Sequence, residues 1–193
     1  MFATAPNTLA AAVVPRTRAR VAMAIAVFGF ALLTGVSALW EIPLPFTPVP
    51  ITGQTFAVLL AGATLGLRAG AASQLLYIAM GIVGVPFFAG GSSGWEVVTG
   101  PTVGYLIGFV AASAVVGRLA EARQDRRVVT AIPALLAGSA VIYLCGMAGL
   151  MAVAGMTASD AFTLGVVPFV VGDAIKVGAA GLALPAAWKL LGR

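Results

Sequence analysis

Long apolar runs alternate with short polar stretches along most of the chain. Six apolar segments can be drawn, over residues 21–39, 51–67, 69–85, 102–119, 130–154 and 161–191. A helix needs about 20 mainly apolar residues to cross a bilayer, and about 17 is the lower limit. Segments 51–67 and 69–85 are close to that limit. For 51–67, a re-entrant segment, which enters and leaves the membrane on the same side, is the alternative to a full crossing. The pattern predicts an all-α polytopic membrane protein, with an N-terminal tail over 1–20 and a single six-helix membrane domain over 21–193.

The positions of the charges fix the expected orientation. The chain is 61% hydrophobic and only 9% charged, whereas a soluble domain has about 25% charged residues. With a cytoplasmic N-terminus, six crossings place ten basic residues in the cytoplasm: Arg16, Arg18, Arg20, Arg68, Arg118, Arg123, Arg126, Arg127, Lys189 and Arg193. The acids Glu41, Glu96 and Asp160 then fall outside. This asymmetry follows the positive-inside rule and predicts that both termini are cytoplasmic.

The segments at the start of the chain and after the first apolar run are expected to lack helices. Met1–Pro15 carries no charged side chain and lacks the basic start of a secretory signal, so we expect a disordered tail before an uncleaved first helix. Residues 42–50 contain four prolines. Proline lacks the amide donor that a helix needs, so this stretch predicts a rigid extracytoplasmic loop.

One basic residue, Lys176, does not fit the topology pattern. It lies three residues after Asp173 in the last apolar segment, so a helix would place both side chains on one face. Each charge costs about 2.5–3.5 kcal/mol at the bilayer centre on insertion scales. Two interpretations follow: a structural ion pair, or a binding site for a polar or anionic solute about 8–18 Å below the outer surface.

Other polar or aromatic residues would open to the same side. Thr52, Gln54 and Thr55 begin the second segment and could either bind a ligand or cap the helix. Tyr77 is either an aromatic wall or plain core. The glycine-rich loop over 90–94, followed by Trp95 and Glu96, could close over a ligand or serve only as a connection.

Several classes of chemistry are excluded. The chain has no histidine and one cysteine, Cys145, so it can build neither an internal disulfide nor a Cys/His metal site. It contains no GxxxxGK[ST] motif for ATP hydrolysis. Without a Ser–His pair or a second intramembrane acid, an enzyme is not expected, and neither is a cofactor or a bound metal.

Small residues recur at four-residue spacing. Gly62 with Gly66, and Gly104 with Gly108, predict close helix packing within the chain. Ala22 and Ala26 lie at the cytoplasmic end of the first helix, where the alternatives are internal packing and docking of a partner membrane protein.

Five motifs occur in a fixed order along the chain. They are Pro48-Val49-Pro50-Ile51-Thr52-Gly53-Gln54-Thr55, Ala61-Gly62-Ala63-x-Leu65-Gly66, Gly84-Val85-Pro86-x-Phe88-Ala89-Gly90-Gly91, Gly100-Pro101-Thr102-x-Gly104-Tyr105-Leu106-Ile107-Gly108-Phe109 and Gly172-Asp173-x-x-Lys176. Together they resemble the BioY family over nearly all of the chain after Arg20. BioY proteins are the biotin-capturing substrate-binding (S) components of energy-coupling factor (ECF) transporters.

The resemblance implies both a site and partners. It implies six helices in the bacterial cell (inner) membrane, with an extracytoplasmic biotin pocket that contains Asp173 and Lys176. It also implies a transmembrane coupling (T) subunit, which Ala22 and Ala26 would contact, and two cytoplasmic ABC-type ATPases.

The chemistry of biotin fits the candidate residues. The ureido ring could be bound by Asp173 with Gln54 or Thr52, and the valerate carboxylate by Lys176 or by amides of the loop that holds Gly90 and Gly91. Tyr77, Phe88 and Trp95 suit the thiophane ring and the alkyl chain. Which end of biotin meets which group is left open at this point.

Two other functions compete with biotin capture. One is a stand-alone proton-coupled carrier of another small metabolite, with Asp173 as the proton relay. The other is a non-transporting assembly subunit, in which the charged pair is only structural.

Overall fold

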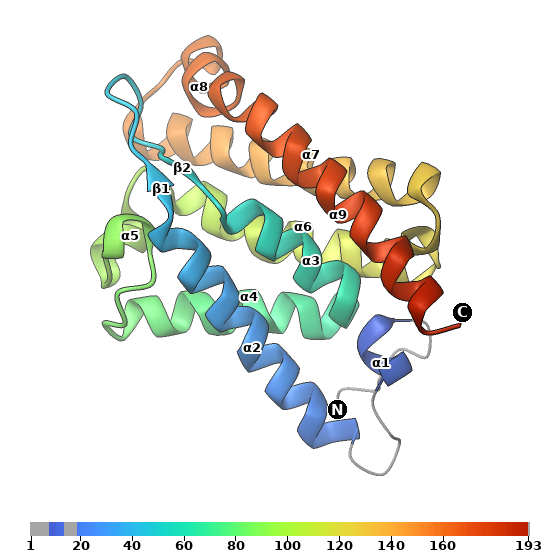
Figure 1. The fold of residues 1–193 in the computed structure, drawn as a ribbon. Coiled ribbons are helices and arrows are strands. Elements are labelled where there is room, and N and C mark those ends of the chain that lie inside the picture. The colour runs from blue at the N-terminus through green and yellow to red at the C-terminus, as the bar shows by residue number, and fades with distance from the viewer. Residues whose placement is uncertain (1–7, 14–18, 193) are drawn as a thin grey trace.

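The apolar segments form helices that lie side by side (Figure 1). The computed structural model describes residues 8–13 and 19–192. Within these residues, four helical stretches are long and apolar enough to cross a membrane: α2 (Ala19–Leu39), α6 (Val103–Glu121), α7 (Val128–Ala154) and the stretch 158–190. Two shorter helices, α3 (Gln54–Leu65) and α4 (Leu67–Ile82), pack beside them. The fold is therefore that of an all-α membrane protein.

Helix α3 is shorter than the segment predicted over 51–67. It has 12 residues, which at 1.5 Å per residue gives roughly 18 Å, against a hydrocarbon thickness of about 30 Å. It starts late because Ile51 and Thr52 are in a strand. It ends early because Gly66 has φ +86° and separates α3 from α4. Gly66 therefore makes the turn between the two helices, and its backbone also packs closely on another helix, since a Cβ added at Gly117 would lie 2.7 Å from the Gly66 carbonyl oxygen.

The last predicted segment, 161–191, is also broken. It consists of α8 (Ala158–Gly165), a 3₁₀ turn η4 (Val167–Phe169) and α9 (Val170–Leu190). Pro168 lies in the 3₁₀ turn and has no amide hydrogen to continue the α8 ladder. As a consequence α9 begins only three residues before Asp173, which lies in its first turn.

A short hairpin occupies the place of the predicted proline-rich loop. Strands β1 (Glu41–Ile42) and β2 (Ile51–Thr52) pair antiparallel, with Glu41 opposite Thr52. The prolines lie in the connection between the strands. The segment after α4 holds η2 (Ala89–Gly91) and α5 (Trp95–Thr99), and lies at the same end of the bundle as the hairpin. We call this end the hairpin end.

The opposite end, which we call the basic end, carries Arg68, Arg118, Arg123, Arg126, Arg127 and Lys189. There the α6–α7 connection, with its 3₁₀ turn η3 (Gln124–Arg126), packs against the end of α9. The buried Trp188 indole donates a hydrogen bond of 2.6 Å to Asp125 Oδ2, and the Arg126 guanidinium lies 4.3 Å from the ring centroid of Trp188.

The predicted close packing between helices is present. A Cβ added at Gly104 of α6 would lie 2.9 Å from Gly149 Cα of α7, and one added at Gly108 would lie 3.0 Å from Ile142 Cα. A Cβ added at Gly62 of α3 would lie 2.5 Å from the Ser113 carbonyl oxygen of α6. These glycines let helix backbones approach closely within the chain.

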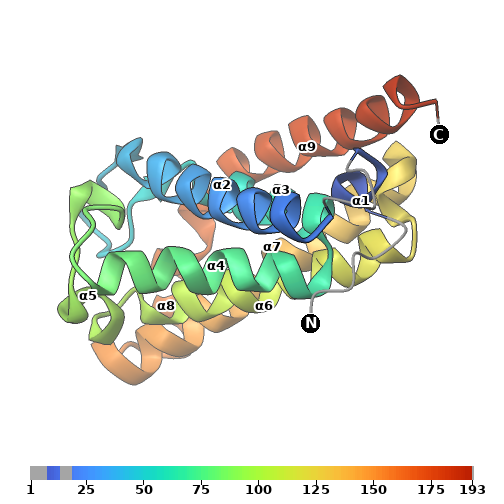
Figure 2. The same cartoon turned by 90° about the horizontal axis from the view of Figure 1, so that it is seen from below.

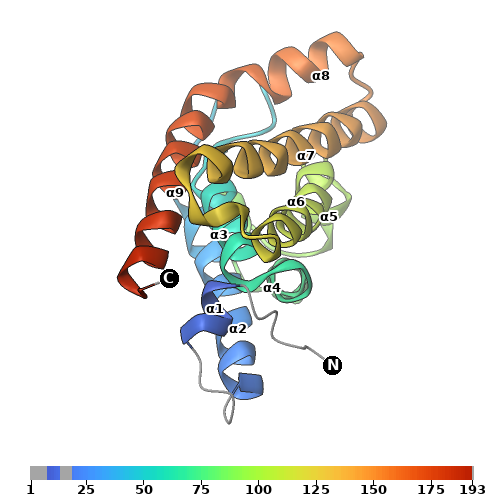
Figure 3. The ribbon, with the colours of Figure 1, turned by 90° about the vertical axis from the view of Figure 1, so that its right-hand side faces the viewer.

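Part of the predicted disordered tail is helical, and that expectation was wrong for the residues concerned. Helix α1 (Leu9–Val13) packs at the basic end beside α2 and α3 (Figures 2 and 3). Leu9 is buried in a cluster with Leu59, Ala63 and Trp188. Because α3 stops short, apolar surface beneath its end is left for α1 to cover. Residues 1–7 and 14–18, including Arg16 and Arg18, lie outside the described part.

Candidate ligand-binding site

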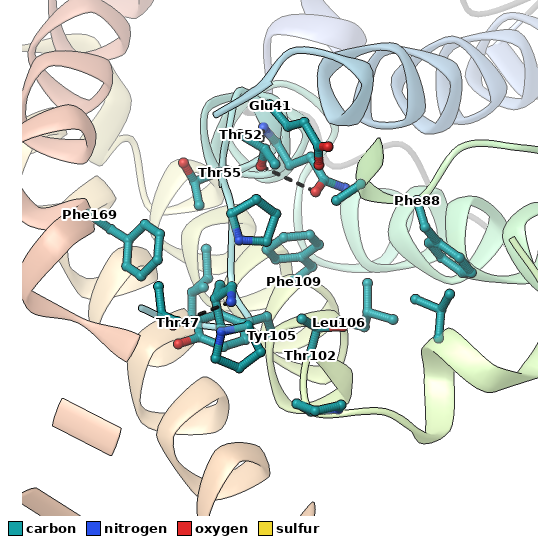
Figure 4. A pocket seen from close by; sticks show the side chains of 18 of the residues that line it. Glu41, Thr47, Thr52, Thr55, Phe88, Thr102, Tyr105, Leu106, Phe109 and Phe169 are labelled. Atoms are coloured by element: carbon teal, nitrogen blue, oxygen red, sulfur yellow. Dashed lines mark hydrogen bonds between the residues drawn. The ribbon is translucent and has the colours of Figure 1, made fainter. Parts of the chain in front are cut away.

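A cavity of about 510 Å³ lies at the hairpin end, within the range of about 300–1,000 Å³ that is usual for small-molecule sites. The hairpin, α3, α4, α6, α7, η4 and α9 all contribute to its wall. Glu41, Thr52 and Thr55 lie together at one side of it, and Thr102, Tyr105 and Leu106 at the other (Figure 4). Its charged lining residues are Glu41, Glu96, Asp173 and Lys176.

Asp173 is the centre of a hydrogen-bonded cluster. It is 5% exposed. Its Oδ1 accepts hydrogen bonds from Thr55 Oγ1 at 2.8 Å and from Lys176 Nζ at 2.7 Å, and its Oδ2 accepts one from the Tyr143 hydroxyl at 2.6 Å. A carboxylate has about four lone-pair positions, so one position on Oδ2 accepts no hydrogen bond from the described part of the chain.

Lys176 has all three of its protons engaged. Besides Asp173, its Nζ donates to the Thr52 carbonyl at 2.8 Å and to Thr55 Oγ1 at 3.0 Å. An ammonium group has three N–H donors. The lysine therefore neutralises Asp173 and ties α9 to the start of α3.

A second polar group lies at the first turn of α3. Gln54, 5% exposed, donates from Nε2 to the Tyr77 hydroxyl at 2.6 Å, and its Oε1 accepts from Thr52 Oγ1 at 3.2 Å. The buried Tyr77 ring packs edge-on against Phe88, with 5.7 Å between ring centroids. Among the residues that the structure describes, the second N–H of the Gln54 amide has no partner.

The rest of the wall is largely apolar. Its large side chains are Leu44, Phe88, Val97, Tyr105, Leu106, Phe109, Ile142 and Phe169. The Tyr105 hydroxyl turns away to donate to the Gly165 carbonyl at 2.6 Å. The arrangement suits a ligand with one polar, hydrogen-bonding end and an apolar body.

The local sequence explains the position of Asp173. Pro168 lies in the 3₁₀ turn between α8 and α9, and α9 begins directly after that turn, so the Asp173 carboxylate lies in the first turn of α9. Negative charge is stabilised at the N-terminus of a helix, by about 0.3–1 kcal/mol for exposed groups. The three-residue spacing brings Lys176 onto the same face, as the sequence predicts.

Six of the nine predicted substrate-binding residues line this one cavity: Thr52, Gln54, Tyr77, Phe88, Asp173 and Lys176. The other three, Gly90, Gly91 and Trp95, lie outside its lining. Trp95 is 65% exposed, because it begins α5 with its ring turned to the surface. Gly90 contacts a lining residue, since a Cβ added there would lie 2.9 Å from Glu41 Oε1.

The sequence alone predicts no place in the site for Tyr143, Phe169 or Glu41, and no separate role for Thr55. Tyr143 could have been found from the sequence, because the chain has only three tyrosines, Tyr77, Tyr105 and Tyr143, and each lies inside a predicted apolar segment. All three line the cavity. For Glu41 and Phe169, no signal in the sequence pointed to the cavity.

The predicted partner-docking alanines are not fully exposed. Ala26 packs against an internal cluster of Met23, Leu65 and Ala69, and Ala22 is partly buried. The outward face of α2 near them carries larger side chains such as Ile25 and Phe28, which are 66% and 49% exposed.

Comparison with known proteins identifies the family. The model of the BioY family matches residues 9–193. The chain belongs to the BioY family. The probable biotin transporter BioY of Pyrococcus horikoshii is 41% identical over 151 residues, which cover 78% of this chain and 86% of that protein. The biotin transporter BioY of Rhizobium etli is 35% identical over 159 residues, covering 79% and 84%.

A solved structure shares the fold. The S-component for biotin from an ECF-type ABC transporter aligns with a TM-score of 0.82 and 21% identity, over 92% of this chain and 95% of that one. The family resemblance inferred from the five motifs is thus confirmed, and the BioY fold agrees with the all-α membrane architecture.

Proposed function

We propose that this BioY chain is the S component of a biotin uptake transporter. It would capture biotin at the outer face of a bacterial cell membrane, and a coupling (T) subunit with cytoplasmic ABC-type ATPases would power import. The observation that carries the proposal is the Asp173 cluster, which faces an apolar cavity in a chain of this family. The names of the relatives and the shared fold support it.

The free hydrogen-bonding positions favour one orientation of biotin. The ureido ring has two N–H donors and one carbonyl acceptor. Counting bonds to residues 8–13 and 19–192, Asp173 Oδ2 has an acceptor position left and Gln54 Nε2 has a donor left, whereas the Lys176 protons are all engaged. We therefore place the ureido ring at Asp173, with the thiophane ring and alkyl chain along the aromatic wall.

We also propose six membrane crossings with both termini in the cytoplasm. The basic end would then be cytoplasmic and the hairpin end extracytoplasmic, in agreement with the positive-inside rule. Glu41, Glu96 and the cavity share the hairpin end. On this topology α3 and α4 cross as short helices, and Ala22 and Ala26 lie on the cytoplasmic side, where α2 would meet the coupling subunit.

Direct titration of the purified protein with biotin and desthiobiotin tests the proposal. Asp173→Asn and Lys176→Ala should each abolish high-affinity binding while the protein still inserts. Thr55→Val removes one hydroxyl that bridges both charges and should weaken binding about 10- to 100-fold, because hydrogen bonds to charged groups contribute about 1.5–3 kcal/mol each. Wild-type affinity in the Asp173 and Lys176 variants would reject the site.

Thr34→Val is the matched control for Thr55→Val. Thr34 is likewise a threonine within a helix, fully buried where Thr55 is partly buried, but its hydroxyl donates to the Phe30 carbonyl at 2.9 Å and lies outside the cavity. Its variant should keep full affinity. Uptake by the isolated chain that persists under ATPase inhibition and stops with an uncoupler would instead favour a proton-coupled carrier.

A further inference from the structure

The hairpin between α2 and α3 has one side toward the cavity and one side away from it (Figure 1). Glu41, Leu44 and Thr47 line the cavity. Trp40 and Ile42 lie outside its lining, and they are 81% and 61% exposed. Successive side chains of a strand point to opposite faces, and β1 follows this rule, with Glu41 partly buried and Ile42 exposed. The hairpin is thus a thin wall with the ligand cavity on one side only.

The outward side of this hairpin is apolar. Its large exposed side chains are Trp40, Ile42 and Phe46, and the last of these is 56% exposed. The only charged residue over 40–53 is Glu41, which belongs to the cavity side. Apolar surface is stabilised when it is removed from water, and contiguous exposed apolar patches mark sites of contact with a protein or a membrane. The outward side of the hairpin therefore fits an apolar partner.

The same surface continues the outward side of α2, a helix that is long and apolar enough to cross a membrane. Near the end of α2, Val36 and Leu39 are 48% and 47% exposed. They share one face of the helix because three residues separate them, and Trp40 follows directly as the chain leaves the helix. Tryptophan is enriched where membrane proteins meet the boundary between lipid and water. The continuity with α2 thus indicates lipid as the partner of the hairpin.

We propose that Trp40, Ile42 and Phe46 rest in the outer leaflet of the bilayer, at the boundary between headgroups and acyl chains. We call these three the anchor residues. The bilayer then holds the hairpin in place as a wall of the cavity, so that retention of the ligand depends on lipid contacts that lie outside the site. This inference rests on the proposed function for its ligand, and on the proposed topology, in which the hairpin end is extracytoplasmic.

Tryptophan fluorescence of the full chain in nanodiscs of phosphatidylcholine and phosphatidylglycerol locates Trp40. The chain has three tryptophans, so Trp95→Phe leaves Trp40 together with Trp188, which is buried at the basic end. The variant that combines Trp40→Phe with Trp95→Phe measures the Trp188 background.

Lipids brominated on their acyl chains should quench the Trp40 emission, whereas iodide in the water should quench it only weakly. Strong quenching by iodide without an effect of the brominated lipids would place Trp40 in water and overturn the inference. Protection from both quenchers would indicate burial against a second copy of the chain, and would overturn it as well.

The rate at which labelled biotin leaves the protein in the same nanodiscs tests the effect on retention. Ile42→Gln combined with Phe46→Gln removes two anchor residues and leaves every residue of the cavity lining in place. We expect dissociation to become roughly five- to thirtyfold faster, because the burial of two large apolar side chains no longer holds the hairpin. An unchanged rate would overturn the inference.

Val129→Gln is the matched control. Val129 is 84% exposed at the basic end, outside the cavity lining, so this variant should keep the wild-type rate. Equal Tm values for the control and the double variant establish that a faster release does not come from damage to the fold. Failure of the wild type to bind biotin would overturn the proposed function, whereas the quenching experiment would still decide whether the hairpin rests in lipid.

Discussion

The ion pair of α9 allows a test that separates a structural role from a binding role. Lys176→Met keeps the length of the side chain and removes its charge, and Asp173→Asn keeps the shape of the carboxylate and removes its charge. The double variant removes both charges. The Asp173 side chain is 7% exposed and the Lys176 side chain 21%, so neither charge is well hydrated when its partner is lost.

The size of the effect follows from burial. Removing one partner of a buried pair costs about 3–5 kcal/mol, and each kcal/mol shifts the Tm of a protein of this size by about 2–4 °C. Lys176→Met should therefore lower Tm by roughly 6–20 °C. Asp173→Asn should cost less, because the more exposed lysine can reach toward water. The double variant should recover most of the loss, since no unpaired charge remains.

Thermal unfolding in detergent or lipid nanodiscs, followed by tryptophan fluorescence, measures stability, and biotin titration of the same samples measures binding. We expect all three variants to lose biotin, including the stable double variant. A double variant as unstable as the sum of the two single variants would refute the coupling of the charges. A double variant that still retains biotin would show that the pair is only structural.

Three further predictions concern packing and pH. Gly104→Ala should strongly destabilise the protein, measured as a fall in Tm. Gly178→Ala should leave Tm nearly unchanged, because a Cβ added at Gly178 has no neighbour within 4 Å. Equal Tm values for the two variants would contradict the described helix packing. Burial raises the pKa of the Asp125 carboxyl above its usual 3.8. As pH rises from about 4 through the raised pKa, the carboxyl ionises in a buried place, so the Tm of the wild type should fall relative to the Tm of Asp125→Asn. A wild-type Tm that rises relative to that variant over the same pH range would reject this prediction. Leu9→Ser should lower Tm by several degrees, while Val13→Ser, at a 63% exposed position, should not.

The sequence predicts the helices and the charged pair because both depend on local rules. Apolar segments long enough to cross a bilayer are visible as runs, and an i, i+3 pair must share a helix face whatever surrounds it. The glycine contacts of α6 and α7 follow equally from a four-residue spacing. The bounds of α3 were wrong because a β-strand pairing and the positive φ of Gly66 shorten it.

The partners of Asp173 depend on tertiary structure and could not be predicted in the same way. Thr55 and Tyr143 lie 118 and 30 residues away from it in the chain. Only the packing of α3 and α7 against α9 brings their hydroxyls to the carboxylate. The exposure of Trp95 likewise depends on how α5 turns, which no local pattern of glycines reveals.

The short α3 has a practical consequence for handling the protein. The helix that carries Gln54 and Thr55 rests at its far end on Leu9, ahead of the first membrane-crossing segment, and the family match also begins at residue 9. A chain trimmed back to residue 19 would lose the contact of Leu9 with the end of α3, and an affinity tag fused directly before residue 8 would disturb that contact. Vitamin retention would then suffer through residues that never touch the vitamin.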